Sequence, residues 1–426
     1  MQQSSSNGSS PEPKSYWHVT APPPVPNDPL PDAADVVVVG GGMLGVWSAY
    51  WLAKTGANVT LIERTAISWG ATGRNGGFVI AGLAEGFTTG AERIGHDAAW
   101  DVWKLSEEGR QIVQTVVEEE GIDCEYRLSG TVGLALTEED RDAMHHGAAI
   151  LGEKGVTVEP LDQQGVQELI QTPLGADIHG GIYHRNNALL HSARYLAGVA
   201  QAAQRHGARL CLANVTKLVS DGDATLVETS AGTIRAGKVI VGINAWTDEL
   251  IPSLAGIVVP VRGRILSYAP VPPVFTTGIG ASVTPTGEYW QQTMDGSIVL
   301  GGCRADAPGG DVGVRDPVPT PDVIAKLDAV FPRLFPQLGG LKISQSWAGL
   351  MAFTSDYLPV ADAVPDMPGV WAAGGFCGHG MPFGPRLGQL LAEAAMTGLT
   401  PTALSPLRID RPTLTAYVAA EQPAAV

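Results

Sequence analysis

Three glycines near the start of the chain have the spacing that binds a phosphate group. Gly40, Gly42 and Gly45 fit the pattern Gly-x-Gly-x-x-Gly, directly after four valines at residues 36–39. Such a run predicts a strand buried on both faces. The first glycine permits a tight turn, the second lets the backbone approach a pyrophosphate, and the third lets a helix pack on the strand. The helix expected at residues 43–54 directs its positive dipole end at the phosphates, so the pattern predicts a dinucleotide site.

A carboxylate and a second glycine-rich loop follow this turn. The next expected strand, residues 58–62, leads to Glu63, whose carboxylate accepts hydrogen bonds from ribose hydroxyls. Residues 68–77 then read Ser-Trp-Gly-Ala-Thr-Gly-Arg-Asn-Gly-Gly, with Arg74 near the middle. A simple NAD-binding domain has no use for this loop, whereas a flavin enzyme uses it along the pyrophosphate towards the isoalloxazine ring. The loop therefore favours FAD over NAD, and an NAD-dependent dehydrogenase is the alternative.

A third glycine-rich segment lies near the C-terminal end. Residues 373–385 carry five glycines around His379, just before a helix expected from about Pro385 to Thr397. Backbone N–H groups at a helix start stabilise negative charge, here that of a reduced flavin. His379 itself has two interpretations that the residues leave open. It either orients substrate or tunes the flavin, or it makes a hydrogen bond that holds the loop.

Several later segments extend the pattern of a Rossmann-type domain. A helix is expected at residues 191–206, strands at 208–214 and 224–229, and buried strands at 238–242 and 370–373. The fold class is therefore α/β, and α+β overall.

Other segments do not fit that sheet and indicate a second domain. Helices between about 91 and 172 and strands between about 257 and 302 predict a second domain inserted into the first. The expected ranges are a disordered or extended N-terminal arm at 1–32, an FAD-binding domain at 33–90, 186–256 and 340–410, a substrate-binding domain at 91–185 and 257–339, and a C-terminal tail at 411–426.

Composition excludes several other functions. The formal net charge is −16 and the eight lysines form no basic run, which argues against a nucleic-acid partner. The four cysteines lie far apart without a Cys-x-x-Cys pair, so no metal site is expected and the thiols are expected to be reduced. No signal peptide and no apolar run of 18 residues is present, which predicts a cytoplasmic protein without a membrane span.

These pieces, in this order, resemble the FAD-dependent oxidoreductases of the D-amino-acid oxidase superfamily, which includes glycine oxidase and sarcosine oxidase. The resemblance covers about residues 15–405 and is closest to the gamma-glutamylputrescine oxidoreductase-like branch. Three motifs carry it: the arm at Ser15, Tyr16 and Trp17, the loop at residues 69–77, and the Gly-x-x-Gly-His-Gly turn at residues 375–380. The arm is expected to dock on the body. The resemblance implies that the inserted second domain is an antiparallel-sheet substrate domain.

The resemblance also implies site residues. The implied cofactor-binding residues are Gly40, Gly42, Met43, Leu44, Gly45, Glu63, Arg64, Ala71, Thr72, Arg74, Asn75, Gly76, Gly77, Val215, Asn244, Ala245, Trp246, Gly349, Gly375, Gly378, His379, Gly380 and Met381. The implied catalytic or substrate-cavity residues are Arg74, His379, Tyr289, Trp290, Gln292 and Met351.

Two departures from the family pattern matter. Gly349 stands where sarcosine oxidase-like enzymes have the cysteine that binds flavin, and Cys377 does not match that cysteine, so FAD is expected to be non-covalent. Met351 stands where glycine oxidase has the arginine that pairs with the substrate carboxylate. A thioether cannot replace that pair. This argues against a simple α-amino acid unless Arg74, Arg262 or Arg264 takes over.

The expected reaction is oxidation of the C–N bond of a small-molecule amine. A hydride passes to flavin N5, the imine hydrolyses, and oxygen or another acceptor reoxidises the flavin. An aliphatic amine or amide-linked polyamine is the first expectation for the substrate, and an N-methyl or α-amino acid is the alternative. A flavoprotein without small-molecule turnover, such as an electron-transfer subunit, is the other class considered. The oligomeric state is left open.

Overall fold

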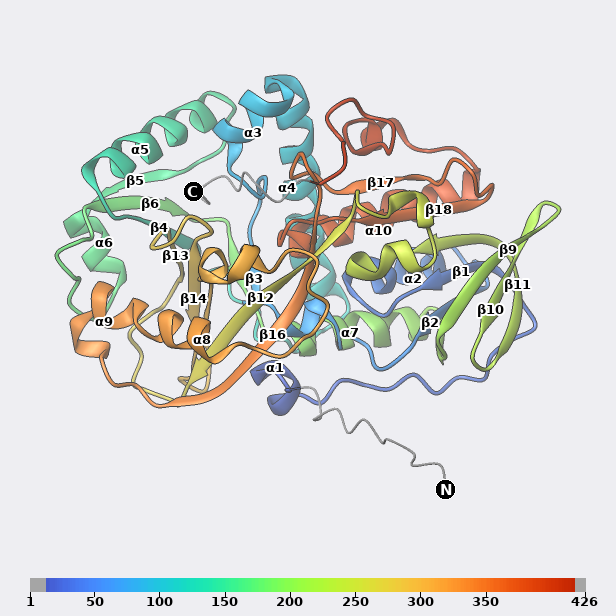
Figure 1. The fold of residues 1–426 in the computed structure, drawn as a ribbon, viewed down its shortest axis with the longest axis horizontal. Helices are drawn as coiled ribbons and strands as arrows, with labels where there is room; N and C mark the ends of the chain where they lie inside the picture. The colour runs from blue at the N-terminus through green and yellow to red at the C-terminus, as the bar shows by residue number, and fades with distance from the viewer. Residues whose placement is uncertain (1–12, 418–426) are drawn as a thin grey trace.

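The computed structural model describes residues 13–417, and two eight-stranded sheets form its framework. The first sheet lies on the right of Figure 1 and the second on the left. The first twelve residues of the arm expected to be disordered or extended, and residues 418–426 of the expected C-terminal tail, lie outside the described residues. The predicted class, an α/β fold with a Rossmann-type sheet and an additional antiparallel sheet, is confirmed.

The first sheet is the Rossmann-type layer. Its strand order is β17-β18-β11-β1-β2-β8, parallel from β18 to β8, and a β9–β10 hairpin extends β11. All four valines at residues 36–39 are buried, as a central parallel strand requires. The strands are β1 (Ala33–Val39), β2 (Val59–Glu63), β8 (Arg209–Leu212), β9 (Val215–Asp221), β10 (Ala224–Thr229), β11 (Gly232–Val241), β17 (Val360–Ala363) and β18 (Val370–Gly374).

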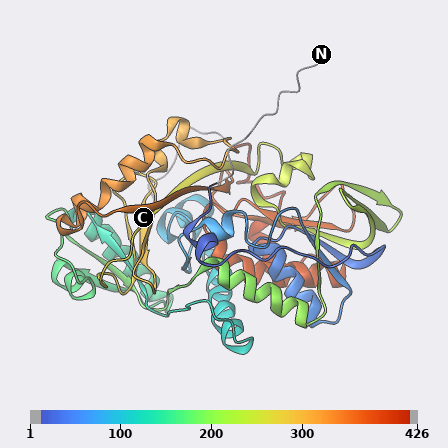
Figure 2. The same cartoon turned by 90° about the horizontal axis from the view of Figure 1, so that it is seen from below.

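Four helices build the main core against this sheet. They are α2 (Met43–Lys54), α4 (His96–Glu119), α7 (Ser192–Arg205) and α10 (Gly380–Thr397), and α10 packs on both α2 and α4. Figure 2 shows α2 and α7 side by side beneath the sheet. Helix α10 begins at Gly380, five residues before the predicted start at Pro385. Glycines and prolines in its first turns had indicated a loop there, although proline is tolerated near a helix start.

The second sheet is mostly antiparallel. Its order is β16-β12-β15-β14-β13-β4-β6-β5, with one parallel pair, β13 and β4. The strands are β4 (Thr131–Ala135), β5 (Glu159–Asp162), β6 (Gly180–His184), β12 (Val259–Tyr268), β13 (Gly278–Ala281), β14 (Glu288–Gln292), β15 (Ile298–Gly301) and β16 (Ile343–Phe353). Helices α8 (Pro321–Asp328) and α9 (Val330–Leu334) bury apolar side chains against it.

Shorter elements complete the described chain. They are α1 (Tyr16–Thr20), α3 (Phe87–Ile94), α5 (Glu138–Glu153), α6 (Gln163–Leu169), the β3 (Phe78–Val79) and β7 (Ala188–Leu189) pair, and the 3-10 helices η1 (Ala71–Arg74), η2 (Asn244–Glu249), η3 (Pro252–Leu254), η4 (Arg304–Asp306), η5 (Pro308–Asp311), η6 (Pro336–Leu338) and η7 (Thr402–Leu407).

Two elements lie across the domain boundaries expected from the sequence. Strand β16, in the range given to the FAD-binding domain, is an edge strand of the second sheet. Helix α4, in the range given to the substrate domain, packs into the core of the first. The apolar pattern of β16 or of α4 does not show which sheet the element joins, because its apolar face can be buried equally well in the core of either sheet. The division itself stays a prediction.

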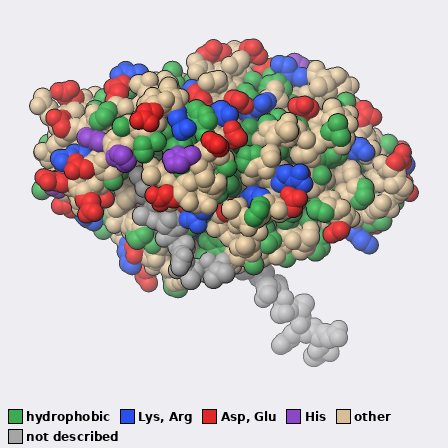
Figure 3. All heavy atoms as spheres, turned by 90° about the horizontal axis from the view of Figure 1, so that it is seen from above, with side chains coloured by type: hydrophobic (Ala, Val, Ile, Leu, Met, Phe, Trp, Pro, Cys, Tyr) green, Lys and Arg blue, Asp and Glu red, His purple; other side chains and the backbone are tan. Residues whose placement is uncertain are grey.

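Within residues 13–417, no helix has the length and apolar character needed to cross a membrane. The same residues contain no group of three His, Cys, Asp or Glu side chains that could hold a metal ion. All four cysteines are buried and unpaired by disulfides. Acidic and basic side chains alternate over the face in Figure 3, with no broad basic area on that face.

Candidate active site

A cavity of about 740 Å³ is lined by both sheets. Its wall begins at the turn after β1, at Gly40, and includes Val215 at the start of β9. From the second sheet it takes Gly263, Tyr289 and Met351. A long cavity that joins a glycine turn to a second domain matches the extended shape of a dinucleotide that carries a reactive ring.

The three motif glycines are required for three different reasons. Gly40 has φ +107°, and a Cβ there would lie 2.8 Å from the carbonyl oxygen of Gly242. A Cβ on Gly45 would collide with the backbone of Gly40, so helix α2 packs too closely for a side chain. Gly42 is different, since its Cβ would meet only the Thr72 hydroxyl at 3.8 Å. Among the described residues no other atom, apart from those of its chain neighbours, comes within 4 Å of this position, so the backbone at Gly42 is open to the cavity, as the close approach of a pyrophosphate requires.

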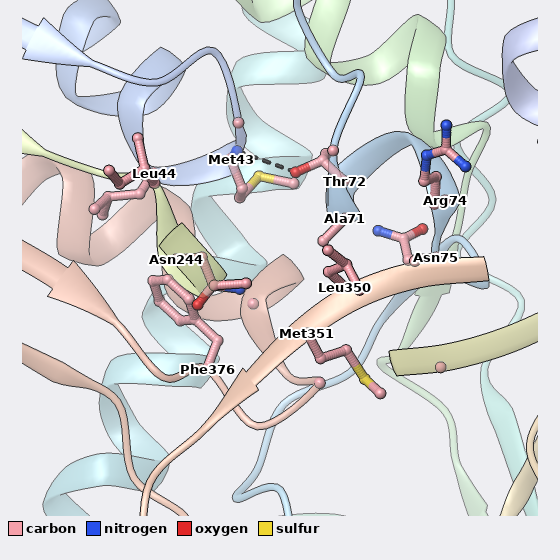
Figure 4. A pocket seen from close by; sticks show the side chains of 18 of the residues that line it. Met43, Leu44, Ala71, Thr72, Arg74, Asn75, Asn244, Leu350, Met351 and Phe376 are labelled. Atoms are coloured by element: carbon pink, nitrogen blue, oxygen red, sulfur yellow. Dashed lines mark hydrogen bonds between the residues drawn. The ribbon is translucent and has the colours of Figure 1, made fainter. Parts of the chain in front are cut away.

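The loop at residues 68–77 is bonded to the glycine turn. The Met43 backbone N–H donates to the Thr72 hydroxyl at 3.1 Å, the dashed line in Figure 4. The Glu63 carboxylate accepts a hydrogen bond from Gly41 N–H at 2.7 Å and another from Thr65 N–H at 2.7 Å. These bonds fix Glu63 at the cavity wall, where an acceptor for ribose hydroxyls is needed.

The N-terminal arm docks on this loop, as expected. Ser15 donates its hydroxyl hydrogen to the Gly73 carbonyl at 2.5 Å, and the Trp17 indole N–H donates to the Asn75 carbonyl at 2.7 Å. The His18 ring stacks on Trp69 with centroids 5.0 Å apart. The loop is therefore held from outside by the arm and from inside by α2.

Arg74 is bound to the chain rather than directed at the centre of the cavity. Its guanidinium donates to the carbonyls of Trp69 at 3.1 Å, Pro13 at 2.9 Å and Ala348 at 3.0 Å. In Figure 4 the guanidinium points away from Met351. These bonds join the arm, the loop and β16, so the side chain positions the wall that its own backbone helps to form.

The nucleotide end of the cavity is polar and aromatic. Val215, Asn244 and Ala245 line it, and the Asn244 side-chain oxygen accepts a hydrogen bond from Gly375 N–H at 3.0 Å. Trp246 lies between two guanidinium groups, with Arg64 at 4.5 Å and Arg315 at 5.0 Å from its rings.

Strand β14 sends only one of its three predicted residues into the cavity. Tyr289 lines it, whereas Trp290 packs among Phe275, Phe331 and Phe335 in the core of the second sheet. Gln292 donates its amide hydrogens to nearby backbone carbonyls. The prediction that Trp290 and Gln292 are cavity residues is wrong.

The physical reason is the strand period, since neighbouring side chains point to opposite faces. The residue missed was Gln291, on the opposite face from Trp290 and Gln292. It donates to the Gly76 carbonyl at 2.6 Å and so ties β14 to the loop.

The remaining predicted cofactor residues surround the same space. Gly45, Gly77 and Gly375 do not line the cavity, and a Cβ on each would meet neighbouring protein atoms instead. The residues that do line it are Gly40, Gly42, Met43, Leu44, Glu63, Arg64, Ala71, Thr72, Arg74, Asn75, Gly76, Val215, Asn244, Ala245, Trp246, Gly349, Gly378, His379, Gly380 and Met381.

His379 caps the start of α10 and lines the cavity. Burial lowers its pKa to about 4, so the imidazole is neutral at pH 7. Its ring interacts with the backbone of Ile80, and its Nε2 atom is buried without a hydrogen-bond partner in the described chain. Both interpretations of His379 remain, because its ring bonds to the Ile80 backbone while Nε2 has no hydrogen-bond partner among the described residues.

Cys377 has the features of an unreactive thiol. Its sulfur lies 3.2 Å from the Gly375 carbonyl and 3.6 Å from the Thr354 hydroxyl. Burial raises the pKa of the thiol to about 12, so it is not a thiolate at neutral pH. At Gly349, where the related cysteine would stand, a Cβ would come within 3.1 Å of the Arg74 Cβ.

Arg262 and Arg264, considered as replacements at Met351, share one carboxylate partner, although no side-chain nitrogen of Arg264 has a hydrogen bond of normal geometry among the described residues. Arg262 donates to Asp311 at 2.6 Å and to the Val318 carbonyl at 2.8 Å, and Arg264 forms an ion pair with the same Asp311. The sequence reasoning missed Arg304, which lines the cavity just after β15. Its signal was weak, because a single arginine in a turn carries no spacing pattern.

Comparison with known proteins agrees with this geometry. A family model described as FAD dependent oxidoreductase matches residues 35–394. Probable oxidoreductase OrdL of Rhizobium meliloti is 28% identical over 394 residues, 90% of this chain and 88% of that protein. Gamma-glutamylputrescine oxidoreductase of Escherichia coli is 27% identical over 401 residues, which are 89% of this chain and 88% of that protein. Glycine oxidase of Geobacillus kaustophilus has the same fold, with a TM-score of 0.77 at 23% identity over 89% of this chain and 99% of that structure.

Proposed function

The chain belongs to the family of FAD-dependent oxidoreductases, and from this premise we propose that it oxidises the C–N bond of an amine substrate. The observation that carries the proposal is the single cavity that runs from Gly42 to Tyr289, Met351 and His379. One end has the glycine turn and the ribose acceptor that a dinucleotide needs. The other end lies under the second sheet, away from the phosphate-binding turn.

Bound FAD supplies a hydride acceptor, its N5 atom. The residues of the chain bind and orient the substrate so that the carbon bearing nitrogen faces that atom. Loss of hydride from the neutral amine would leave an iminium ion, which water hydrolyses to a carbonyl compound, an amine and a proton, and oxygen or another acceptor would take up the two electrons. The cavity fits FAD because the backbone at Gly42 is open to it and the start of α10 presents backbone N–H groups at Gly380 and Met381.

Within residues 13–417, every carboxylate that lines the cavity has a partner, and there are three of them. Glu63 accepts backbone hydrogen bonds at the glycine turn, Glu85 pairs with Arg93 at 2.9 Å, and Glu249 pairs with Arg64 at 3.6 Å. A neutral His379 can accept a proton but does not repel an amine. The amine therefore enters unprotonated and reacts without a carboxylate base.

The flavin is proposed to be non-covalent. Gly349 has no nucleophile, and the Cys377 thiol is protonated and bonded to its own loop.

The test is an anaerobic visible spectrum of the purified protein, recorded while gamma-glutamylputrescine, putrescine, sarcosine, glycine and D-alanine are added in turn. Bleaching of the flavin band by an amine supports the proposal. A yellow protein that none of these compounds bleaches would contradict it and favour an electron-transfer role.

The alternative substrate class, an N-methyl or α-amino acid, is favoured by one observation: a cavity arginine, Arg304, that has no carboxylate partner among the described residues. Bleaching by sarcosine, glycine or D-alanine alone would select this alternative.

A further inference from the structure

Four of the five arginines that line the cavity are engaged with the chain. Arg74 binds three backbone carbonyls, and Arg264 pairs with Asp311. Arg64 and Arg315 pair with carboxylates of η2. Within residues 13–417, the fifth arginine has neither a carbonyl nor a carboxylate partner.

That fifth arginine is Arg304, the first residue of η4. Its Nη1 atom is buried without a hydrogen-bond partner, and no described carboxylate pairs with it. Its guanidinium carbon lies 4.6 Å from the centre of the Phe353 ring. Burial lowers the pKa of Arg304, as expected for a cation that has lost water and gained no anion. A buried charge in this state is costly unless a ligand neutralises it.

A second polar group lies beside Arg304. The Tyr357 hydroxyl is buried without a hydrogen bond of normal geometry in the described chain, although the Tyr417 hydroxyl lies close enough to interact with it and to contribute to the raised pKa of Tyr357. The Tyr357 ring stands edge to face against Phe353, with centroids 5.7 Å apart. Its backbone has φ +57°, a conformation that aromatic residues rarely adopt.

Arg304 and Tyr357 both line the cavity and both contact Phe353. We propose that Arg304, together with Tyr357, binds a carboxylate of the amine substrate. A guanidinium and a phenol hydroxyl offer donors to the two oxygens of such a group, which would satisfy both buried side chains at once.

The position of Met351 fits this assignment. Met351 packs in the same cluster as Phe353 and Tyr357, and in Figure 4 its thioether extends from β16 away from Ala71 and Thr72. Strand β16 has no arginine at Met351, and Arg304 would supply the positive charge instead from the turn after β15, two strands away in the sheet. The substrate class that follows is an amine that carries a carboxylate, and this refinement rests on the proposed function.

The first experiment measures binding to the FAD-loaded enzyme. Acetate, benzoate and 4-aminobutanoate are titrated while the flavin spectrum and the melting temperature are followed, with benzyl alcohol as the neutral probe. For the native enzyme, at least one carboxylate should perturb the flavin band in a saturable way. R304Q should weaken that binding at least tenfold. R333Q is the matched control, because Arg333 pairs with Asp177 on the surface and does not line the cavity.

Two further variants keep the test decisive if R304Q does not fold. Y357F removes one hydroxyl and should weaken carboxylate binding about threefold to tenfold without affecting benzyl alcohol. R304K keeps the charge but loses the planar fork, so it should bind carboxylates more weakly than the native enzyme. Dissociation constants that are unchanged in both Y357F and R304K, or a native enzyme that binds none of the three carboxylates, would overturn the proposal.

Turnover separates this inference from the proposed function. If no amine bleaches the flavin but carboxylates bind through Arg304, the proposed function fails and the anion site stands. If amines bleach it, and R304Q leaves the preference for gamma-glutamylputrescine over putrescine unchanged in kcat/KM, the function stands and the anion site fails.

Discussion

The indole N–H of Trp17 donates a hydrogen bond of 2.7 Å to the backbone carbonyl of Asn75. Trp17 is fully buried, and the bond joins an N-terminal arm to the loop whose other side lines the cavity. The arm therefore contributes to the shape of the cofactor site although it does not line it.

Replacing Trp17 by Phe is expected to weaken FAD binding. The ring still packs, but the hydrogen bond is lost, which costs about 1 kcal/mol and roughly a fivefold increase in the dissociation constant of FAD. The measurement is the titration of apoprotein with FAD. W51F is the matched control, because the Trp51 indole donates to the Pro385 carbonyl at 3.1 Å and does not touch the loop. Equal FAD affinities in the two variants would show that the arm does not support the loop.

The variants G42A and G45A should lose different properties, FAD binding in the first and stability in the second. A Cβ at Gly42 has only the Thr72 hydroxyl within 4 Å, so G42A is expected to fold with nearly native circular dichroism. The methyl group projects towards the cavity, and FAD binding should fall at least tenfold. A Cβ at Gly45 collides with Gly40, so G45A is expected to lower the melting temperature or to prevent folding. A G42A protein that purifies yellow would contradict the assignment of Gly42 to the pyrophosphate.

Acid precipitation of the purified enzyme should release all of its flavin. Gly349 offers no side-chain nucleophile, and burial keeps the Cys377 thiol protonated, with a pKa of about 12. The supernatant should contain all of the FAD that the enzyme held before precipitation, measured by absorbance, and C377S should release the same amount. Flavin that stays with the precipitate of the native protein but not with that of C377S would reveal a covalent bond to Cys377.

The sequence allowed the glycine turn and the strands on either side of it to be predicted well, because each rests on local rules, whereas β9 and β17 of the first sheet were not expected. The four valines at residues 36–39 are buried on both faces, as in any central strand of a parallel sheet. Gly40 has a positive φ because the turn itself requires it. Helix Met43–Lys54 begins and ends at the predicted residues.

The second sheet was harder to predict in residue detail. Trp290 and Gln292 were placed on the same face as Tyr289, although strand alternation separates them. Arg304 could not have been found, because its importance depends on which other cavity arginines already have partners. That information is tertiary, and no spacing in one chain segment carries it.

Four histidines, His18, His184, His191 and His379, have a pKa that burial lowers to about 4, and the first and third of them connect the pH dependence of stability to the arm. His18 and His191 are both about 1% exposed, and burial lowers the pKa of each to about 4. The His18 ring bonds to the Ser68 carbonyl at 3.1 Å, and the His191 ring bonds to the Thr20 hydroxyl at 2.9 Å. Both residues hold the arm against the body in their neutral form.

The direction of this pH dependence follows from which state, folded or unfolded, binds the protons. Above pH 6.5 both histidines are neutral in the folded and unfolded states, and their contribution to stability is complete. Between pH 6.5 and about 4 only the unfolded state binds the protons, so the free energy of unfolding should fall by about 1.4 kcal/mol per pH unit for each histidine. Urea unfolding followed by tryptophan fluorescence at pH 7, 6 and 5 measures this slope.

The variant H191Q tests the origin of the slope. Glutamine keeps a hydrogen-bond donor for Thr20 but does not titrate, so the decline between pH 6 and 5 should be smaller by about 1.4 kcal/mol per pH unit. H146Q serves as the control, because His146 is exposed on α5, away from the arm. If H191Q declines as steeply as the native protein, His191 is not the group that titrates, and the acid sensitivity must come from other buried groups.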